Sequence, residues 1–351
     1  MAIKEIKHEF IIEDLESRIR VDAFIASNIE GLSRSQVASK DSIVLVNDKK
    51  VKNSSKIFNG DRVEFTYFQQ DLEKLEATDI PLNILYEDDD IIAINKDQGI
   101  IVHPGSGNFD GTLVNALAFH LGSAYQEAFI EDLSEPEEED EDEIESYKLD
   151  PLRPGIVHRL DKDTSGSMVV AKNKESYYDL VKQFKERTTK KSYIAIVKGV
   201  FTKRRGKILS NIIRDPKDRK KFKVCSDTEG KNAETTYVVL KQYEGFALLR
   251  VNIHTGRTHQ IRVHLSSINH PVLGDPIYSN ISKRFRNATL MLHAIKLEII
   301  HPKTGETINF VSPMPDRFKK ILKVLPSFAI AKGQGEKYYE SAVKVISHTH
   351  S

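Results

Sequence analysis

The 351-residue chain contains a single cysteine, Cys225, and no hydrophobic run long enough to cross a membrane. One thiol excludes a framework of internal disulfides, and the lack of a cysteine cluster excludes a thiolate zinc site. No window approaches the 18 apolar residues of a membrane-spanning helix, and the opening stretch MAIKEIKHEFIIEDLE has no secretory hydrophobic core. We therefore expect a cytoplasmic protein that makes no contact with membranes.

The chain also lacks a large net charge of either sign, with a formal balance of +1 at pH 7. This balance hides a strong local asymmetry, because residues 131–145 contain 11 acidic residues and no lysine or arginine. Without them, 52 basic residues face 40 acidic ones, a balance of +12. A basic body suits a polyanionic partner, although a lysine-rich solvated surface would explain the charge equally well. Like-charge repulsion predicts that residues 131–147 form a disordered insertion.

The stretch GIVHRLDKDTSG, residues 155–166, is the most distinctive one in the chain. Two apolar residues lead into Arg159 and Asp161, and Thr164-Ser165-Gly166 favours a tight turn. A carboxylate would then lie where a strand ends, beside an arginine. From residue types alone, a solvated turn carboxylate is the commoner interpretation. The kinase catalytic loop is excluded, because a leucine separates Arg159 from Asp161 and no DFG or VAIK-like segment is present.

Two other patterns suggest cofactor or metal sites and then fail on spacing. Gly105 and Gly107 resemble a phosphate-binding loop, but Asp110 occupies the place of the third glycine. His259 and His264 are five residues apart, whereas the metalloprotease pattern needs a spacing of four with an intervening glutamate. We therefore expect neither a metal nor a cofactor.

Residues 18–68 are predicted to form a small α/β unit after a lead-in of residues 1–17. Val21, Phe24 and Ile25 have helical spacing, and the strand at 43–46 is followed by a turn at Asn47-Asp48. Residues 34–56 contain six basic residues against two acidic ones, which favours contact with phosphates rather than choice of sequence, although an ordinary basic surface is the alternative. Its candidate RNA-binding residues are Arg34, Lys49, Lys50 and Lys52.

The remainder of the chain predicts a larger domain over residues 79–326, after a polar linker at 69–78 and before a flexible tail at 327–351. Strands are expected at 100–103, 168–171, 190–199, 233–240, 246–253, 292–300 and 308–311. Helices are expected from Thr112, over 174–187 and over 315–325. The segment 203–223 is basic and is predicted to be an RNA-facing loop.

These motifs resemble a known family. GIVHRLDKDTSG closely resembles the signature of the RluA/RluD family of RNA pseudouridine synthases, and GRTHQIRVHL, HPVLGDPIY and LHAIKLEIIHP are similar to further family motifs in the same order. The resemblance covers roughly residues 84–325. In front of it, LSRSQ…VNDKKVK…GDRVEF is similar to the RNA-binding domain of the ribosomal-protein-S-four type.

The resemblance implies roles for particular residues. Asp161 would be the catalytic aspartate, Arg262 its ionic partner, and Tyr193 the aromatic ring that stacks on the target base. Arg159 would fill the space left by the flipped uridine. His158 and Arg257 are further candidates for RNA contact, and a structural hydrogen bond is the alternative role for His158.

The implied fold is α+β, a mixed but largely antiparallel sheet with flanking helices, and the implied activity is the isomerisation of uridine in large-subunit ribosomal RNA. This reaction breaks an N-glycosidic bond, rotates the base and makes a C–C bond, so no cofactor is required. A transfer RNA synthase remains an alternative within the class, and a catalytically silent RNA-binding assembly factor is an alternative outside it. RNA is the expected partner of a monomeric protein.

Overall fold

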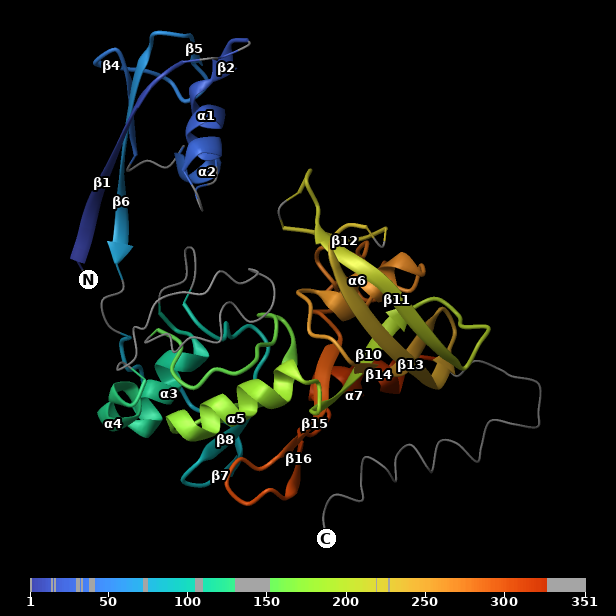
Figure 1. The fold of residues 1–351 in the computed structure, drawn as a ribbon. Coiled ribbons are helices and arrows are strands. Elements are labelled where there is room, and N and C mark those ends of the chain that lie inside the picture. The colour runs from blue at the N-terminus through green and yellow to red at the C-terminus, as the bar shows by residue number, and fades with distance from the viewer. Residues whose placement is uncertain are drawn as a thin grey trace. The chain divides into compact units, whose positions relative to one another are not determined.

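The computed structural model divides the chain into two units, Met1–Lys74 and Leu75–Ser351 (Figure 1). The structure describes residues 2–13, 15, 17–29, 32, 34–37, 42–71, 75–104, 110–129, 152–218, 220–226 and 228–326. The predicted acidic insertion at 131–147 and the predicted tail at 327–351 lie outside these residues. Among the described helices, none has the length and apolar character needed to span a bilayer.

The first unit is a four-stranded sheet with two short helices and a small two-stranded ladder. The sheet has the order β1-β6-β3-β4, and the ladder pairs β2 with β5. Its helices contribute Val21 and Ile25 to a core that also contains Val44, Val63 and Phe65. The elements are β1 (Ala2–Ile11), β2 (Ile19–Arg20), α1 (Val21–Asn28), α2 (Arg34–Val37), β3 (Ile43–Val46), β4 (Lys49–Lys50), β5 (Lys56–Ile57) and β6 (Arg62–Asp71).

The boundaries of this unit differ from the prediction at both ends. The predicted lead-in at 1–17 contains β1, which pairs antiparallel with β6 from Ala2↔Asp71 to Ile11↔Arg62. The predicted linker at 69–78 begins inside β6 and ends against the second unit, where Leu75 is buried in the core. The sequence predicts only a short strand at 9–12 within this lead-in, because the apolar residues before it do not alternate regularly with the charged ones. The turn at Asn47-Asp48 is confirmed, since both residues have positive φ.

The second unit contains a ten-stranded sheet in the order β12-β11-β13-β14-β10-β15-β9-β8-β7, with β16 paired to β15. All the pairings are antiparallel except β9 with β15. The predicted α+β fold is therefore confirmed. Its strands are β7 (Ile84–Glu87), β8 (Ile91–Lys96), β9 (Ser165–Ala171), β10 (Lys190–Lys198), β11 (Arg205–Arg214), β12 (Phe222–Cys225), β13 (Lys231–Tyr243), β14 (Phe246–Ile253), β15 (Leu292–Ile300) and β16 (Thr307–Val311).

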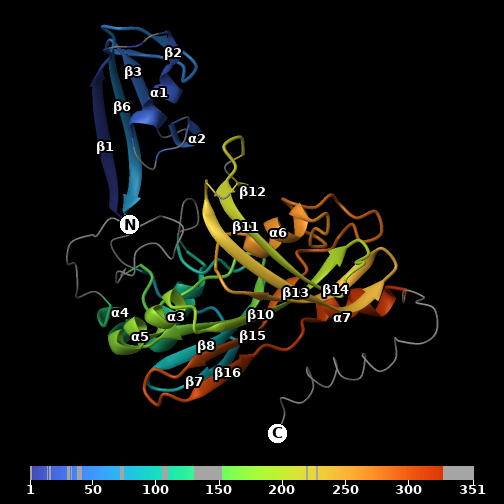
Figure 2. The ribbon, with the colours of Figure 1, turned by 45° about the vertical axis from the view of Figure 1, so that its right-hand side comes forward.

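Helices cover the two halves of this sheet separately. Figures 1 and 2 show α3, α4 and α5 grouped beside β7–β9, and α6 beside β11–β13. The apolar face of α5 buries Leu180 and Val181 in the main core, while Val263 of α6 packs with Phe222 and Ala233 in a second cluster. The helices are α3 (Leu113–Leu121), α4 (Ser123–Glu127), α5 (Lys174–Lys185), α6 (Gln260–Ser267) and α7 (Asp316–Val324).

Two predicted elements of the second unit are wrong. The basic segment 203–223 is largely strand, because β11 pairs with β12 on one side and β13 on the other. Ile208 and Ile212 of β11 face the core, while Arg205 and Lys207 are exposed. The predicted strand at 100–103 is instead irregular, although Leu113 and Val114 donate hydrogen bonds to its carbonyl groups.

The signature stretch enters the sheet rather than leaving it. Ile156 makes only an isolated bridge to Val170, and β9 begins at Ser165, inside the predicted turn. Gly166 has φ +122°, and a Cβ atom there would lie 2.2 Å from the carbonyl oxygen of Ala294. Glycine at this position allows β9 to approach β15 closely.

Candidate active site

The three residues predicted to form the site come from three different elements. Asp161 lies in the loop before β9, Tyr193 lies in β10, and Arg262 lies in the first turn of α6. Ala294 of β15 pairs with Gly166 on one side and with Tyr193 on the other. The central strand β15 therefore sets the spacing between the signature loop and the tyrosine.

Arg262 joins two carboxylates. Its Nη1 donates to Oδ2 of Asp161 at 3.0 Å, while Nε and Nη2 donate to the two oxygens of Asp275 at 2.8 and 3.0 Å. The arginine side chain is 4% exposed and that of Asp275 is 0% exposed, whereas the Asp161 side chain is 24% exposed. Burial opposes the positive charge, but the hydrogen bonds and charges of the two carboxylates raise the pKa of Arg262 above its ordinary value.

Asp275 is the residue that sequence reasoning missed. It follows Gly274 in HPVLGDPIY, a segment recognised as a family motif but given no role. Its Oδ1 also accepts hydrogen bonds from the backbone N–H groups of Ile277 and Tyr278. Burial disfavours its ionised form, yet the contacts to Arg262 lower its pKa below the ordinary value. Asp275 therefore holds the arginine, which leaves Asp161 as the carboxylate that solvent can reach.

Tyr193 supplies a buried aromatic group near this carboxylate. Tyr193 is 7% exposed, and β10 is buried on both faces from Tyr193 to Val197. Burial, with a smaller contribution from the charge of Asp161, raises the pKa of the phenol. The tyrosine is therefore neutral at physiological pH.

His259 also approaches Asp161, with its Nε2 atom 3.9 Å from Oδ2 of that carboxylate. Its Nδ1 atom lies 2.9 Å from the hydroxyl of Tyr278, which accepts a hydrogen bond from the backbone N–H of Phe222. Because the Tyr278 hydroxyl already accepts from Phe222, it can donate its own proton to Nδ1 of His259. Nδ1 is then the acceptor, and the ring proton of His259 lies on Nε2, facing Asp161. Burial lowers the pKa of His259 despite the opposing charge of Asp161, so the ring is neutral.

Lys96 supports the signature loop from β8. Its Nζ atom donates to the carbonyl oxygens of Lys162, Asp97 and Ile100 at 2.7 to 3.2 Å. The amide of Gln98 donates to the carbonyl of Asp163 at 2.7 Å. Burial lowers the pKa of Lys96 to about 8, although the charge of Asp161 opposes the shift. The side chains of Lys96 and Gln98 thus fix the backbone of Lys162 and Asp163, directly after Asp161.

This geometry can be compared with known proteins. The RNA pseudouridylate synthase family matches residues 90–267, a span that contains Asp161, Tyr193 and Arg262. A protein named ribosomal large subunit pseudouridine synthase D, from Borreliella burgdorferi, is 40% identical over 319 residues, which are 89% of this chain and 91% of that protein. This chain belongs to the RNA pseudouridylate synthase family.

Further relatives agree with this membership. A pseudouridine synthase D of Neisseria meningitidis is 38% identical over 320 residues, covering 87% of this chain and 78% of that protein. The solved structure of human RNA pseudouridylate synthase domain containing 4 has a TM-score of 0.50 at 26% identity, covering 69% of this chain and 92% of that one. Human RNA pseudouridylate synthase domain containing 1, at 24% identity and a TM-score of 0.54, has the same fold, with 78% and 97% covered.

The predicted RNA contacts of this family member are placed unequally. Arg159 is exposed beside Asp161, and Arg257 is partly exposed, with its Nε bonded to the carbonyl of Asn232. His158 is buried instead: its Nε2 accepts the backbone N–H of Val169 at 3.0 Å and its ring stacks on Phe184. Burial lowers its pKa to about 3. The expectation that His158 contacts RNA is therefore replaced by a structural role.

In the first unit, the lysines predicted to bind RNA are exposed. Lys49 and Lys50 form the whole of β4, and Lys52 follows it. Arg34 is exposed but shares the buried carboxylate of Asp22, at 3.3 Å, with a neighbouring arginine. The three lysines consequently offer the more available charge.

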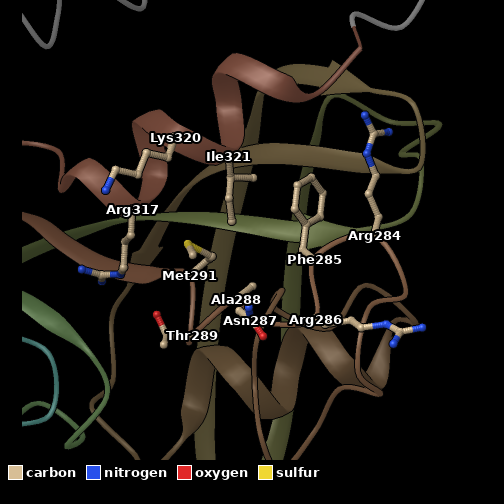
Figure 3. Close-up of a pocket in the computed structure, with 10 residues that line it drawn as sticks. All are labelled: Arg284, Phe285, Arg286, Asn287, Ala288, Thr289, Met291, Arg317, Lys320 and Ile321. Carbon is tan, nitrogen blue, oxygen red and sulfur yellow. The ribbon is translucent and has the colours of Figure 1, made fainter.

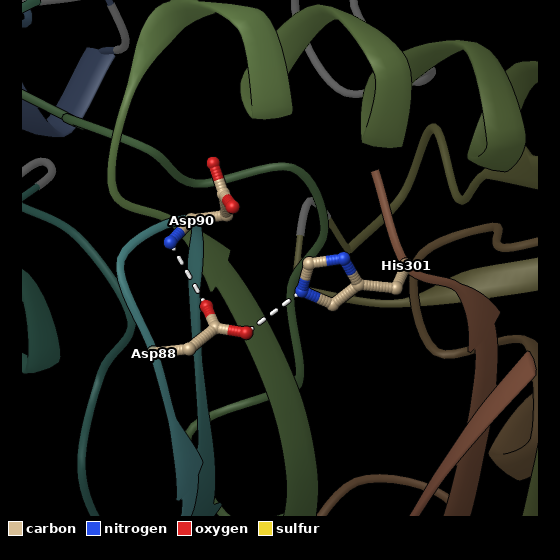
Figure 4. Close-up of side chains that lie close together, drawn as sticks. All are labelled: Asp88, Asp90 and His301. Atoms are coloured by element: carbon tan, nitrogen blue, oxygen red, sulfur yellow. Dashed lines mark hydrogen bonds and ion pairs between the residues drawn. The ribbon is translucent and has the colours of Figure 1, made fainter. Parts of the chain in front are cut away.

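Asp88, Asp90 and His301 form a cluster with metal-ligand chemistry (Figure 4). Oδ2 of Asp88 lies 2.7 Å from Nε2 of His301, and Oδ1 accepts the backbone N–H groups of Asp90 and Ile91. Nδ1 of His301 accepts two further backbone N–H groups, which places the ring proton on Nε2, facing Asp88. Oδ1 of Asp90 accepts hydrogen bonds from Asn173 and Ser176, so within the described residues this cluster is a hydrogen-bonded network that ties two turns together.

Proposed function

We propose that this enzyme isomerises uridines of large-subunit ribosomal RNA to pseudouridine, with Asp161 as the nucleophile. The observation that carries the proposal is the partly exposed Asp161 carboxylate, held by a buried arginine that Asp275 fixes from behind. The ribosomal substrate is supported by the names of the relatives from Borreliella burgdorferi and Neisseria meningitidis. Residues 18–68 are proposed to bind RNA phosphates as a domain of the ribosomal-protein-S-four type.

The proposed reaction needs no second substrate. The bond between the ribose and N1 of uracil breaks, the base turns, and its C5 bonds to the ribose while the C5 proton is lost and N1 gains one. Arg262 donates a hydrogen bond to the Asp161 carboxylate and holds it in one orientation. Because the leaving base is retained, one carboxylate is sufficient, in contrast to the two that glycoside hydrolysis uses.

Tyr193 is proposed to hold the detached base by stacking, and Arg159 to occupy the space left by the flipped uridine. Stacking of a base on an aromatic ring contributes about 1–3 kcal/mol, which offsets the few kcal/mol that unstacking costs. The neutral phenol of Tyr193 can donate a hydrogen bond without adding a second negative charge beside Asp161. These roles use only side chains that lie around the signature loop.

Pseudouridine mapping in cells that lack this protein tests the proposal. We expect specific sites in large-subunit ribosomal RNA to lose the modification, and we expect wild-type protein, but not its Asp161→Asn variant, to restore them. Loss confined to transfer RNA would replace the proposed substrate. Unchanged maps in both RNA classes would favour a silent assembly factor.

A further inference from the structure

A pocket of about 330 Å³ lies between the first turns of α7 and the chain segment before β15 (Figure 3). We name the segment Arg284–Met291 the pocket loop. The lining includes no carboxylate and four cationic side chains, and none of these four forms an ion pair with a carboxylate in the part of the chain that the structure describes. The cations are Arg284, Arg286, Arg317 and Lys320.

The pocket has an apolar centre with charges on both sides. Figure 3 shows Phe285, Met291 and Ile321 in the middle, with Arg317 and Lys320 extending to one side and Arg284 and Arg286 to the other. Met291 and Ile321 are 2% and 8% exposed and form a firm floor. A flat apolar group with an anion at each end would match this arrangement.

Arg317 is a partly buried cation with incomplete partners. Its Nη2 donates to the hydroxyl of Ser165 at 2.6 Å and to the carbonyl of Leu292 at 3.3 Å. Its Nε is buried and has no hydrogen-bond partner among the described residues. Its direct hydrogen-bond acceptors are neutral, and Asp97 acts on it through its charge without forming an ion pair. A partly desolvated guanidinium held in this way is costly, and a bound anion would compensate that cost.

The pocket is connected to the active site through the sheet. Because β9 and β15 are parallel, the signature loop and the pocket loop enter the sheet at the same edge. Ser165, which bonds Arg317, is four residues beyond Asp161. A second connection runs through Gly274, the residue before Asp275. Its backbone packs on the carbonyl of Thr289 in the pocket loop.

We propose that this pocket is a subsite for one unpaired nucleotide of the substrate RNA, adjoining the target uridine. The base lies against Phe285 and the apolar floor, and its flanking phosphates contact the cations on either side. Stacking on an aromatic ring together with backbone charge neutralisation is the usual chemistry of single-stranded RNA sites. The subsite rests on the proposed function, because it requires an RNA substrate.

Filling the pocket while keeping its charges is the first test. Ala288→Phe adds a ring at a half-buried lining position. With a ribosomal RNA fragment that contains the modified uridine, we expect a Kd about ten-fold higher and an unchanged saturating single-turnover rate. Replacing one RNA nucleotide near the target by an abasic one should weaken wild-type binding by a similar factor and leave Ala288→Phe unaffected.

Removing the charges is the second test, and it does not depend on how the filled variant folds. The double variant Arg286→Gln, Lys320→Gln should raise the Kd and reduce the slope of log Kd against log salt by about one to two. The matched control Lys283→Gln, Lys323→Gln removes the same charge from exposed positions directly before the pocket loop and in α7, outside the pocket. It should remain close to wild type.

The proposal is overturned if Ala288→Phe binds this RNA as tightly as wild type does, or if the two double variants bind it alike. It is also overturned if no abasic position weakens binding by wild type while leaving binding by Ala288→Phe unchanged. Failure of the subsite leaves wild-type product formation intact. Failure of the proposed function is distinct, because wild-type protein would then form no Asp161-dependent pseudouridine in ribosomal RNA.

Discussion

The two carboxylates that contact Arg262 have different roles, because one is buried and the other is partly exposed to solvent. Asp275 is fully buried and accepts hydrogen bonds from both Nε and Nη2 of the guanidinium, so it fixes the arginine. Asp161 receives only one hydrogen bond from it and retains contact with solvent. A carboxylate that is oriented but still accessible is what an attack on a flipped nucleotide requires.

The first prediction compares these two aspartates by stability. Asp275→Asn should lower the free energy of unfolding by about 3 kcal/mol, because it leaves a buried guanidinium without its main counter-charge. Asp161→Asn should cost about 1 kcal/mol or less, since Arg262 keeps Asp275 and the site is partly solvated. Urea denaturation of both variants measures the difference. Equal losses would mean that Asp275 does not anchor the arginine.

Lys96 gives a prediction for pH. Because burial lowers its pKa to about 8, the folded state loses this proton at a pH where the unfolded state still holds it. Between pH 8 and the ordinary lysine pKa, the unfolded state therefore binds more protons, and this group makes stability rise with pH by up to ~1.4 kcal/mol per unit.

Lys96→Met should remove that rise, whereas the exposed Lys190→Met should keep it. The measurement is the free energy of unfolding at several pH values from 7 to 10 for the three proteins. Contributions from other buried lysines are common to all of them and cancel in the comparison. Parallel curves for wild type and Lys96→Met would contradict a pKa of Lys96 that burial lowers.

For single residues, the sequence predicted those that belong to distinctive motifs. It missed those whose role depends on contacts with residues far away in the sequence. Asp161 and Arg262 were predicted, and the structure places them 3.0 Å apart. Asp275 could not be predicted, because its role depends on a loop that returns to α6 only in the folded chain. His158 was misplaced for the same reason, since Phe184, on which it stacks, belongs to a helix that follows the next strand.

At the scale of elements, strong apolar runs predicted strands accurately, as for β14 and β15. The prediction failed where a strand contains many charged residues. In β11, only Ile208, Asn211 and Ile212 are buried, and the basic residues occupy exposed positions, so composition alone suggested a loop. Its pairing on both sides by β12 and β13 is a long-range property that no local pattern contains.

Gly166 gives a prediction about how these elements fit together. Gly166→Ala should destabilise the protein by more than ~2 kcal/mol, because its Cβ would lie 2.2 Å from the carbonyl of Ala294 at a φ unfavourable for alanine. Gly305→Ala is the matched control, since Gly305 also has positive φ but has no atom within 4 Å of an added Cβ. Thermal unfolding should rank Gly166→Ala well below Gly305→Ala. Similar melting temperatures would show that β9 and β15 tolerate greater separation.

For the whole molecule, the division between Lys74 and Leu75 separates the lysines predicted to contact phosphates in the first unit from the predicted chemistry in the second. Exposed lysines gather on β4 and just after it, and Asp161, Tyr193 and Arg262 all lie in the second unit. A deletion should end at residue 74, because Leu75 is buried in the second unit's core and the carbonyl of Glu76 accepts from Asn115.

Deleting residues 1–74 should weaken RNA binding and flatten its salt dependence, by about one unit of slope for each phosphate that the shortened protein no longer neutralises. The saturating single-turnover rate should stay within a few-fold of wild type, since the sheet that places the site is intact. Kinetics against RNA concentration at two salt levels separate the two effects. A large fall in the saturating rate with unchanged binding would show that the first unit shapes the active site.

The most direct test of the central claim is single-turnover pseudouridine formation by Asp161→Asn on ribosomal RNA. The amide keeps the shape of the side chain but removes its nucleophilic charge. The account predicts no detectable product at saturating RNA and an RNA affinity within about three-fold of wild type, because phosphate contacts elsewhere dominate binding. Appreciable product from this variant would contradict the assignment of Asp161.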